Sequence, residues 1–412
     1  MNMKKTIFIL ISALMVSLAG FSQDFEKSLR QDEEFENVKV DVGADFAMQY
    51  QILDHQADSA LIPLGTGINL PTANLIINAA LADGITVNLS TYLSSRHHVE
   101  AWVKGGYLLM EKLPFLNSSA VNTVMDYIDL KIGVMEINFG DSHFRRSDNG
   151  NVINNPFVGN YILDAFTTAP ALEVFFDHNG IIAMGAVSTG SLRPQLAGYS
   201  SFSGYTEYNT HEELAFYWKG GYDKQITDDF RLRATLSGYH VANHHFGSLY
   251  NGDRAGSRYY LVMKQQTNSS SDVDPASGHT TGRWGPGLTN KNNSYMLNLF
   301  TKFKGFEVFG TYEKATGTTA FGGLEFDFNQ IALEGLYRFG KDEQFFAGAR
   351  YNSVSNDQDM SVNRIQVGGG WFMLDNVVMK AEYVNQQYND FISSYGEDAG
   401  FNGLMLEAAI SF

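Results

Sequence analysis

The chain has 412 residues with a net charge of −16, 13% aromatic residues, 40 glycines, 8 prolines and no cysteine. The lack of cysteine excludes a disulfide framework, a thiolate zinc site and a lipidated N-terminal cysteine, and the negative charge disfavours nucleic acid as a partner. Many aromatic residues and few prolines are typical of a chain dominated by β-strands. The acidic residues gather in the N-terminal segment and in predicted connections, which indicates solvated rims.

The first 22 residues have the pattern of a secretory signal peptide. Lys4 and Lys5 precede an apolar run at 6–19, and small residues follow that suit cleavage before Gln23. An uncleaved transmembrane helix is the alternative, but about 14 apolar residues fall short of the roughly 20 that span a bilayer. Residues 23–37 are then predicted to form an acidic periplasmic segment.

Segments of strand length with alternating polarity follow. In the first of them, Val40 and Val42 alternate with Lys39 and Asp41. Sixteen such segments are predicted, at 38–52, 68–81, 85–95, 98–110, 128–140, 171–178, 181–190, 211–224, 229–242, 292–303, 306–316, 326–339, 344–354, 361–373, 376–388 and 400–412. We therefore predict an all-β fold, a transmembrane antiparallel β-barrel of 16 strands over residues 38–412, with 14 or 18 strands as alternatives.

The lengths of the connections alternate along the chain. Short turns follow even-numbered predicted strands, at 82–84, 178–180, 227–229, 304–305, 340–342 and 374–376, and long connections follow odd-numbered ones, at 53–67, 141–170, 191–210 and 243–291. Several short turns carry the Asn-Gly or Asp-Gly pairs of hairpins. Short periplasmic turns and long extracellular loops are the pattern of outer-membrane barrels. Residues 111–127 are the exception and are predicted to form a periplasmic excursion with a short helix.

Charged side chains recur on the predicted inner faces of the strands. A soluble β-sandwich also alternates in polarity, but a packed core is not expected to pair this many charges. The predicted lumen-lining residues are Lys39, Lys104, Lys131, Lys219, Arg231, Arg233, Arg338, Arg350, Arg364, Lys380, Glu100, Glu213, Glu334 and Glu382. A water-filled lumen, which barrels of 16 to 18 strands possess, would solvate them.

Aromatic residues near strand ends complete the predicted barrel. The expected interfacial girdle consists of Tyr50, Phe139, Trp218, Tyr222, Phe339, Trp371, Tyr383 and Tyr388. In the last segment, Leu404, Leu406 and Ile410 alternate with Met405 and Glu407 and lead to Phe412. Phe412 is predicted to face outward and to act as the assembly signal that the barrel-insertion machinery reads.

The third long connection, at 141–170, is rich in Asn, Gly and aromatic residues. It opens with Gly140-Asp141-Ser142-His143-Phe144-Arg145-Arg146-Ser147-Asp148 and continues through Asn154-Asn155-Pro156-Phe157-Val158-Gly159-Asn160-Tyr161. This stretch resembles one carried by a family of outer-membrane porins from Bacteroidetes-type bacteria, and the mature barrel is loosely similar to the phosphate-selective porin family.

The resemblance implies that residues 141–170 fold inward as the third extracellular loop and set the pore constriction. Its candidate lining groups are His143, Arg145, Arg146 and Asp148. In the alternative interpretation, the two arginines only tie the loop to a carboxylate of the wall. The predicted inner face mixes basic and acidic residues, which departs from the basic ladder expected of a phosphate-selective pore.

Catalytic and metal-binding patterns are weak. Histidines at 97–98, 143, 211 and 244–245 lie near predicted extracellular strand ends, but no G-x-S-x-G or H-E-x-x-H motif occurs. Asp272 and Asp274 depart from the register of a calcium-binding loop and lack the glutamate at its twelfth position. We predict no catalytic residue, no metal and no cofactor.

Together these patterns predict an outer-membrane porin of a Gram-negative bacterium, exported with a cleaved signal peptide. It would be a passive channel for small hydrophilic solutes or ions, in contact with outer-membrane lipid, and a homotrimer is one candidate assembly. The alternatives are a barrel enzyme of the lipase or protease type and a transporter for hydrophobic compounds. The solute and the ion selectivity do not follow from the sequence.

Overall fold

The structure is a computed structural model that describes residues 23, 25–26, 35–69, 72–94, 100–147, 151–192, 213–244, 246–250, 256–267, 278–319 and 323–412. The strands are β1 Lys39–Gln56, β2 Gly67–Ile68, β3 Thr72–Ala82, β4 Ile85–Ser94, β5 Glu100–Met110, β6 Ile128–Glu136, β7 Thr168–His178, β8 Ile181–Ser188, β9 Ala215–Thr227, β10 Phe230–Val241, β11 Asn292–Phe303, β12 Phe306–Thr318, β13 Glu325–Phe339, β14 Phe345–Asn356, β15 Ser361–Leu374, β16 Val377–Asn389 and β17 Ala399–Ser411. The helices are short: α2 Ser119–Met125, α3 Ile392–Tyr395, and the 3₁₀ turns η2 Pro114–Leu116, η3 Ser142–Arg145 and η7 Lys341–Glu343. Among these described helices, none is long and apolar enough to cross a membrane.

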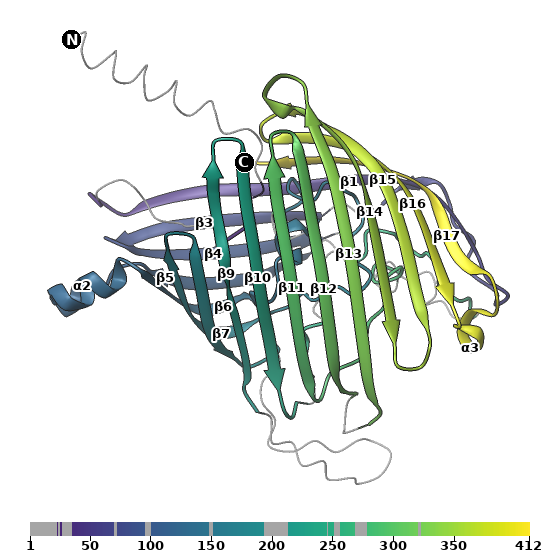
Figure 1. Ribbon diagram of the computed structural model, residues 1–412, viewed down its shortest axis with the longest axis horizontal. Helices are drawn as coiled ribbons and strands as arrows, with labels where there is room; N and C mark the ends of the chain where they lie inside the picture. Colours follow the sequence, from purple (N-terminus) through teal and green to yellow (C-terminus); the bar gives the residue numbers. More distant parts are fainter. Residues whose placement is uncertain are drawn as a thin grey trace.

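The strands form one closed antiparallel barrel (Figure 1). β1 pairs with β17 along Asp45–Gln56 and with β3 along Lys39–Ala47. The two-residue β2 also pairs with β1, so β2 and β3 together form one strand of the wall and the barrel has sixteen strands. The predicted fold class and strand count are confirmed.

The two ends of the barrel differ in their connections. Tight turns join β3 to β4, β7 to β8, β9 to β10, β11 to β12 and β15 to β16, and η7 joins β13 to β14 at the same end. At the β7–β8 turn, Asn179 and Gly180 have φ angles of 53° and 85°, the left-handed conformation that such hairpins need. α2 follows β5 within residues 111–127, as predicted, and Ser118 caps it by accepting a hydrogen bond from the Val121 amide.

Apolar side chains cover the outer face of the wall. Leu236, Leu297 and Val367 are about half exposed, whereas their inward-facing neighbours are buried. An outer row of aromatic rings runs along the end of the tight turns, through Phe306, Tyr337, Phe339, Phe345 and Trp371. A membrane interface favours such a row.

Two residues assigned to this girdle lie elsewhere. Phe139 is in the connection after β6 and is 0% exposed, and Tyr388 is 7% exposed with its hydroxyl bonded to Gln386 inside the barrel. Their prediction as interfacial residues is wrong. Phe139 lies beyond the end of β6 at Glu136, so strand alternation does not apply to it.

The barrel closes at the C-terminal strand. Phe412 exchanges backbone hydrogen bonds with Ala44 of β1, and its side chain is 72% exposed. Gly43 lies beside it, where a Cβ atom would come within 2.7 Å of the Phe412 carbonyl oxygen. A side chain at position 43 would therefore force the closing strands apart.

The interior of the barrel is packed over much of its volume. Its main apolar cluster combines inward-facing strand residues with residues of two long connections, among them Phe139, Ile162, Leu163, Tyr259 and Val262. We call residues 137–167 loop L3 and residues 242–291 the 242–291 loop. L3 ends earlier than predicted, because β7 begins at Thr168. The inward-facing charges described below have ion-pair partners on the wall and ion-pair or hydrogen-bond partners in these segments, so they do not require a water-filled lumen to satisfy them.

Candidate functional site

The charged residues predicted to face inward do so along β9 to β17. Lys219, Arg233, Arg350, Arg364 and Lys380 are each at most 4% exposed. Arg338 pairs with Glu307 at 3.0 Å, and Glu334 and Glu382 are also buried. These residues form a band of charges on the inner face of β9 to β16.

The remaining predicted lining residues are placed differently. Lys39 is exposed beside Asp41, and Glu213 is exposed just before β9. Lys104 is buried and donates to Asn74, and the Lys131 ammonium lies 4.3 Å from the centroid of the Tyr107 ring. The side chain of Glu100 and the whole of Asp148 lie outside the described residues, as does the entire predicted signal peptide.

Asp141 at the start of L3 is the centre of one ion-pair cluster. Its carboxylate accepts hydrogen bonds from Arg233 at 2.8 Å and from Thr235 at 2.7 Å, both on β10, and from Lys219 on β9 at 3.0 Å. Burial raises the pKa of Asp141, but the charges of Lys219 and Arg233 outweigh burial and hold the pKa well below its ordinary value. The carboxylate is ionised and fixes the entry of L3 to the wall.

Arg145, in η3, ties L3 to a nearby part of the wall, β12 and β13. It donates to Glu307 of β12 at 2.9 Å and to Glu334 of β13 at 3.0 Å and 3.2 Å, and it is 1% exposed. The Tyr161 hydroxyl also bonds Glu334. These contacts are those of a tether, the alternative interpretation of this residue, because none of its surface is left to face a pore.

Arg146 and His143 hold L3 to itself and to β6. Arg146 donates to Asp164, in the same loop, at 2.9 Å and 3.0 Å. His143 contacts Glu136 at 2.5 Å and Asn138 at 3.1 Å. Both side chains are at most 4% exposed. Through these contacts the two side chains bind other residues of L3 and Glu136 at the end of β6.

Farther along, L3 is held by its backbone. Arg350 donates to the Gly159 carbonyl at 2.8 Å, Lys380 donates to the Val152 carbonyl at 2.6 Å, and Arg364 donates to the Asn160 carbonyl. The Val158 amide in turn donates to Glu382 at 2.7 Å. Residues chosen from the sequence as pore lining thus serve as anchors, because a folded-back loop needs partners for its buried backbone groups.

The 242–291 loop supplies a second layer of contacts that sequence reasoning missed. Tyr259 donates to Glu382 at 2.6 Å and Tyr250 donates to Glu313 at 2.7 Å, both with their hydroxyls inside the barrel. Burial raises the pKa of Tyr259, and the neighbouring Glu382 raises it further. A sequence signal for these buried contacts was available, because the loop contains a run that is unusually apolar for an external loop, Arg258-Tyr259-Tyr260-Leu261-Val262-Met263.

The same loop contains backbone strain. Arg258, Leu261 and Met263 have φ angles of 75°, 60° and 57°, which cost non-glycine residues about 1–3 kcal/mol each. Arg258 compensates through an ion pair with Glu407 of β17 at 3.2 Å, and Met263 packs in the core. The strained turn is therefore held by its interior contacts.

Three described residues near the N-terminus also contact the inner wall. Gln23 accepts a hydrogen bond from Arg145 at 2.9 Å, and Glu26 pairs with Lys219 at 2.9 Å and Arg233 at 2.7 Å. Phe25 is 4% exposed. These residues of the predicted periplasmic segment therefore reach into the barrel from the end of the tight turns, where the β9–β10 turn lies.

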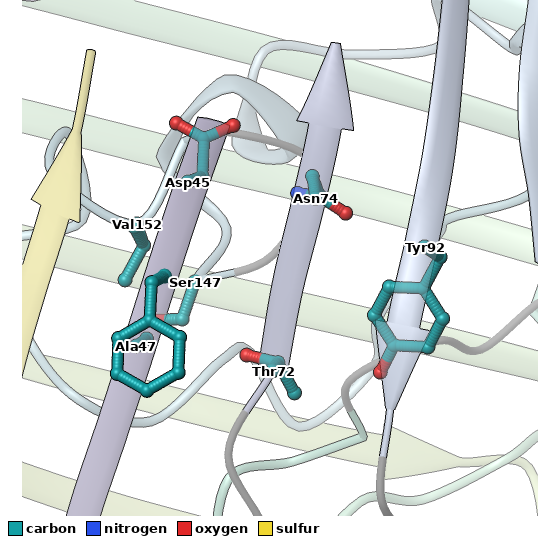
Figure 2. A pocket seen from close by; sticks show the side chains of 8 residues that line it. Asp45, Ala47, Thr72, Asn74, Tyr92, Ser147 and Val152 are labelled. Carbon is teal, nitrogen blue, oxygen red and sulfur yellow. The ribbon is translucent and has the colours of Figure 1, made fainter. Parts of the chain in front are cut away.

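The wall formed by β1 and β3 to β6 is less completely covered. A small pocket separates L3 from this wall (Figure 2), lined by Asp45, Phe46, Ala47, Thr72, Asn74, Tyr92, Ser147 and Val152. Along the same wall Asn78, Asn88 and Lys131 keep part of their surface accessible to water. Partly exposed polar groups therefore lie along this side of L3.

Among the described residues, no group of three or more His, Asp or Glu side chains is placed to hold a metal ion. His244 contacts the Thr189 carbonyl at 2.9 Å and His143 contacts L3 and β6. The histidines at 97–98, 211 and 245 lie outside the described residues, as do Asp272 and Asp274.

Solved structures with similar folds are outer-membrane barrels, whereas no protein-family model and no curated protein matches the sequence. An anion-selective porin from Comamonas acidovorans aligns with a TM-score of 0.54 and 9% identity over 91% of this chain and 100% of that chain. OprB of Pseudomonas putida aligns with a TM-score of 0.52 and 9% identity over 90% of this chain and 94% of that chain. The outer membrane protein OmpT of Vibrio cholerae, in a trimer form, aligns with a TM-score of 0.51 and 12% identity over 92% of this chain and 100% of that chain. At these identities the likeness concerns the fold alone, and this chain has the β-barrel fold of outer-membrane porins.

Proposed function

We propose that this protein is an outer-membrane channel of the porin type, without enzymatic activity, that passes small hydrophilic solutes or ions. The observation that carries the proposal is the closed sixteen-strand barrel, apolar outside and charged inside. A lipid bilayer solvates that outer face, and an apolar-lumen transporter would not need so many inward charges. The predicted signal peptide fits export to the outer membrane of a Gram-negative bacterium, where insertion machinery would read Phe412.

The proposed path runs between L3 and the wall of β1 and β3 to β6. The pocket at Asn74 and Ser147 and the partly exposed Asn78, Asn88 and Lys131 all lie on this side. The opposite wall is occupied by the anchors of L3 and of the 242–291 loop. L3 would thus set the constriction by its position, with Arg145 and Arg146 holding it, as the resemblance to Bacteroidetes-type porins implies for the loop as a whole.

The solute proposed is small and polar, without a preference for phosphate. Selectivity for phosphate, as in the phosphate-selective porin family, would require several unpaired cations along the path. Along the proposed path Lys104 is buried and donates to Asn74, and on the opposite wall Arg350, Lys380 and Arg233 each have a carboxylate partner within 3.0 Å. Mixed, paired charges favour a path that discriminates mainly by size.

Conductance in planar lipid bilayers tests the proposal. The protein should give stepwise ion currents, and Asn74→Trp, which adds an indole to the pocket, should lower the current of each step. Leu75→Trp is the matched control, because Leu75 is on the same strand but faces outward and is 37% exposed. Absence of any conductance step, together with hydrolysis of phospholipid or peptide substrates, would favour the barrel-enzyme alternative instead.

Assembly as a homotrimer is a further part of the proposal. The Vibrio cholerae protein with the similar fold is described in a trimer form, and the apolar outer wall of this barrel offers surface for contact between copies. Chemical crosslinking in native outer membranes should yield a trimer band. A single species at the mass of one chain would limit the assembly to a monomer.

A further inference from the structure

A cationic cluster at the end of the tight turns is occupied by a carboxylate from the N-terminal segment. Lys219 on β9 and Arg233 on β10 bind Glu26 at 2.9 Å and 2.7 Å. Arg231 is two residues before Arg233 on β10 and therefore closer to the β9–β10 turn. It donates to the Gln23 carbonyl at 2.7 Å. The N-terminal residues therefore bind where three cations converge.

Aromatic contacts reinforce this docking. The Phe25 ring lies 5.2 Å from the ring of Phe300 and 5.8 Å from that of Phe144, both edge to face. The Arg233 guanidinium lies 4.3 Å from the centroid of the Phe25 ring. Phe25 thus fills the space between β11, L3 and the arginine, with the geometry that aromatic pairs and cation–π contacts favour.

Among the described residues of the cluster, cations and anions are equal in number only when Glu26 is counted. Lys219, Arg231 and Arg233 are three cations, and Asp141 and Asp223 are the two anions that belong to the loop and the wall. Glu26 is the third described anion, so its departure leaves these cations in excess by one (three minus two) in a largely buried site. An uncompensated charge in such a site attracts an anion strongly.

The face of the cluster that Glu26 occupies is the one open to water. The side chains of Glu26, Asp223 and Arg231 are 15%, 16% and 17% exposed, whereas those of Lys219 and Asp141 are 0% and 1% exposed. Exchange of Glu26 for a dissolved anion would therefore leave the inner half of the cluster in place.

We propose that Lys219, Arg231 and Arg233 form an oxyanion-binding subsite of the barrel, and that Glu26, held by Phe25, occupies it as an intramolecular competitor. The ligand class is a small carboxylate or phosphate, because the carboxylate of Glu26 already makes the bonds that such a group would make. The N-terminal residues thereby close the subsite until they are displaced. The oxyanion ligand of this proposal rests on the proposed channel function, whereas the docking of Glu26 on the cluster does not.

Docking is tested by cysteine labelling, which does not depend on conduction. The chain has no cysteine, so Phe25→Cys introduces a single thiol. It should react with a charged maleimide at least about tenfold more slowly than Glu36→Cys, an exposed position on the same segment. Adding Glu26→Gln to Phe25→Cys should bring its rate close to that of the control. Equal rates for Phe25→Cys and Glu36→Cys would overturn the docking.

Bilayer measurements test the subsite. In the full-length double variant Phe25→Ala/Glu26→Gln, cations are uncovered at the end of the barrel that carries the tight turns, so the reversal potential in a KCl gradient should shift toward chloride, and inorganic phosphate should reverse that shift. Glu36→Gln removes the same charge from an exposed position and should change neither quantity. A reversal potential that the double variant leaves at the wild-type value, while current steps persist, would refute the subsite and leave the channel standing. Silence of every variant would refute the channel, and the labelling rates would then still decide the docking.

Discussion

Arg145→Met removes the guanidinium that fastens L3 to β12 and β13, and it should destabilise the folded barrel measurably. Arg145 donates to Glu307 and Glu334, which are 1% and 0% exposed. Methionine keeps the apolar part of the side chain near Phe309, whose ring centroid lies 5.1 Å from the guanidinium. The variant therefore tests the charge rather than the volume.

The expected loss of unfolding free energy depends on the arginine partner that each carboxylate keeps. Removing one partner of a buried ion pair costs about 3–5 kcal/mol, because a charge is left buried without compensation. Here Glu334 keeps Arg350 at 2.9 Å and Glu307 keeps Arg338 at 3.0 Å. We therefore expect a loss near the lower limit, about 3 kcal/mol of unfolding free energy.

The measurement is a denaturant titration of the barrel in lipid vesicles, followed by tryptophan fluorescence. Lys314→Met is the control, because Lys314 pairs with Asp327 at 2.9 Å on an exposed surface and its loss should cost at most about 1 kcal/mol. If Arg145→Met costs no more than Lys314→Met, then the guanidinium does not fasten L3 and the packed interior is not held by these pairs.

Two further outcomes concern the wall. Leu236→Arg, at a position 45% exposed toward lipid, should cost about 2–4 kcal/mol in the same titration if the site lies near the bilayer midplane, while Leu236→Phe should be nearly neutral; equal costs would mean that this face does not meet lipid. Deletion of Phe412 removes two backbone hydrogen bonds to Ala44 at the closing seam, so the amount of heat-modifiable barrel in the outer membrane should fall, whereas Phe412→Tyr should preserve it. Unchanged levels after the deletion would argue against Phe412 as an assembly signal.

The sequence by itself determined the wall of this protein. Strand alternation depends only on neighbours two residues apart, so the outward set of Phe46, Met48 and Tyr50 could be assigned without any tertiary information, and the structure confirms it. Turn residues such as Asn179 and Gly180 fix hairpins locally in the same way. Strand number, turn positions and α2 followed from these local rules.

Only the tertiary structure decided what fills the barrel. The alternation that places Glu334 or Lys380 on the inner face is the same whether water or a loop lies beside it. The partners that settle the matter, Arg145 and the Val152 carbonyl, are 189 and 228 residues away along the chain. Contacts at that separation leave no periodic trace in a single sequence. The same charged residue that reads locally as pore lining therefore becomes an anchor once a loop supplies the opposite charge or an unpaired carbonyl.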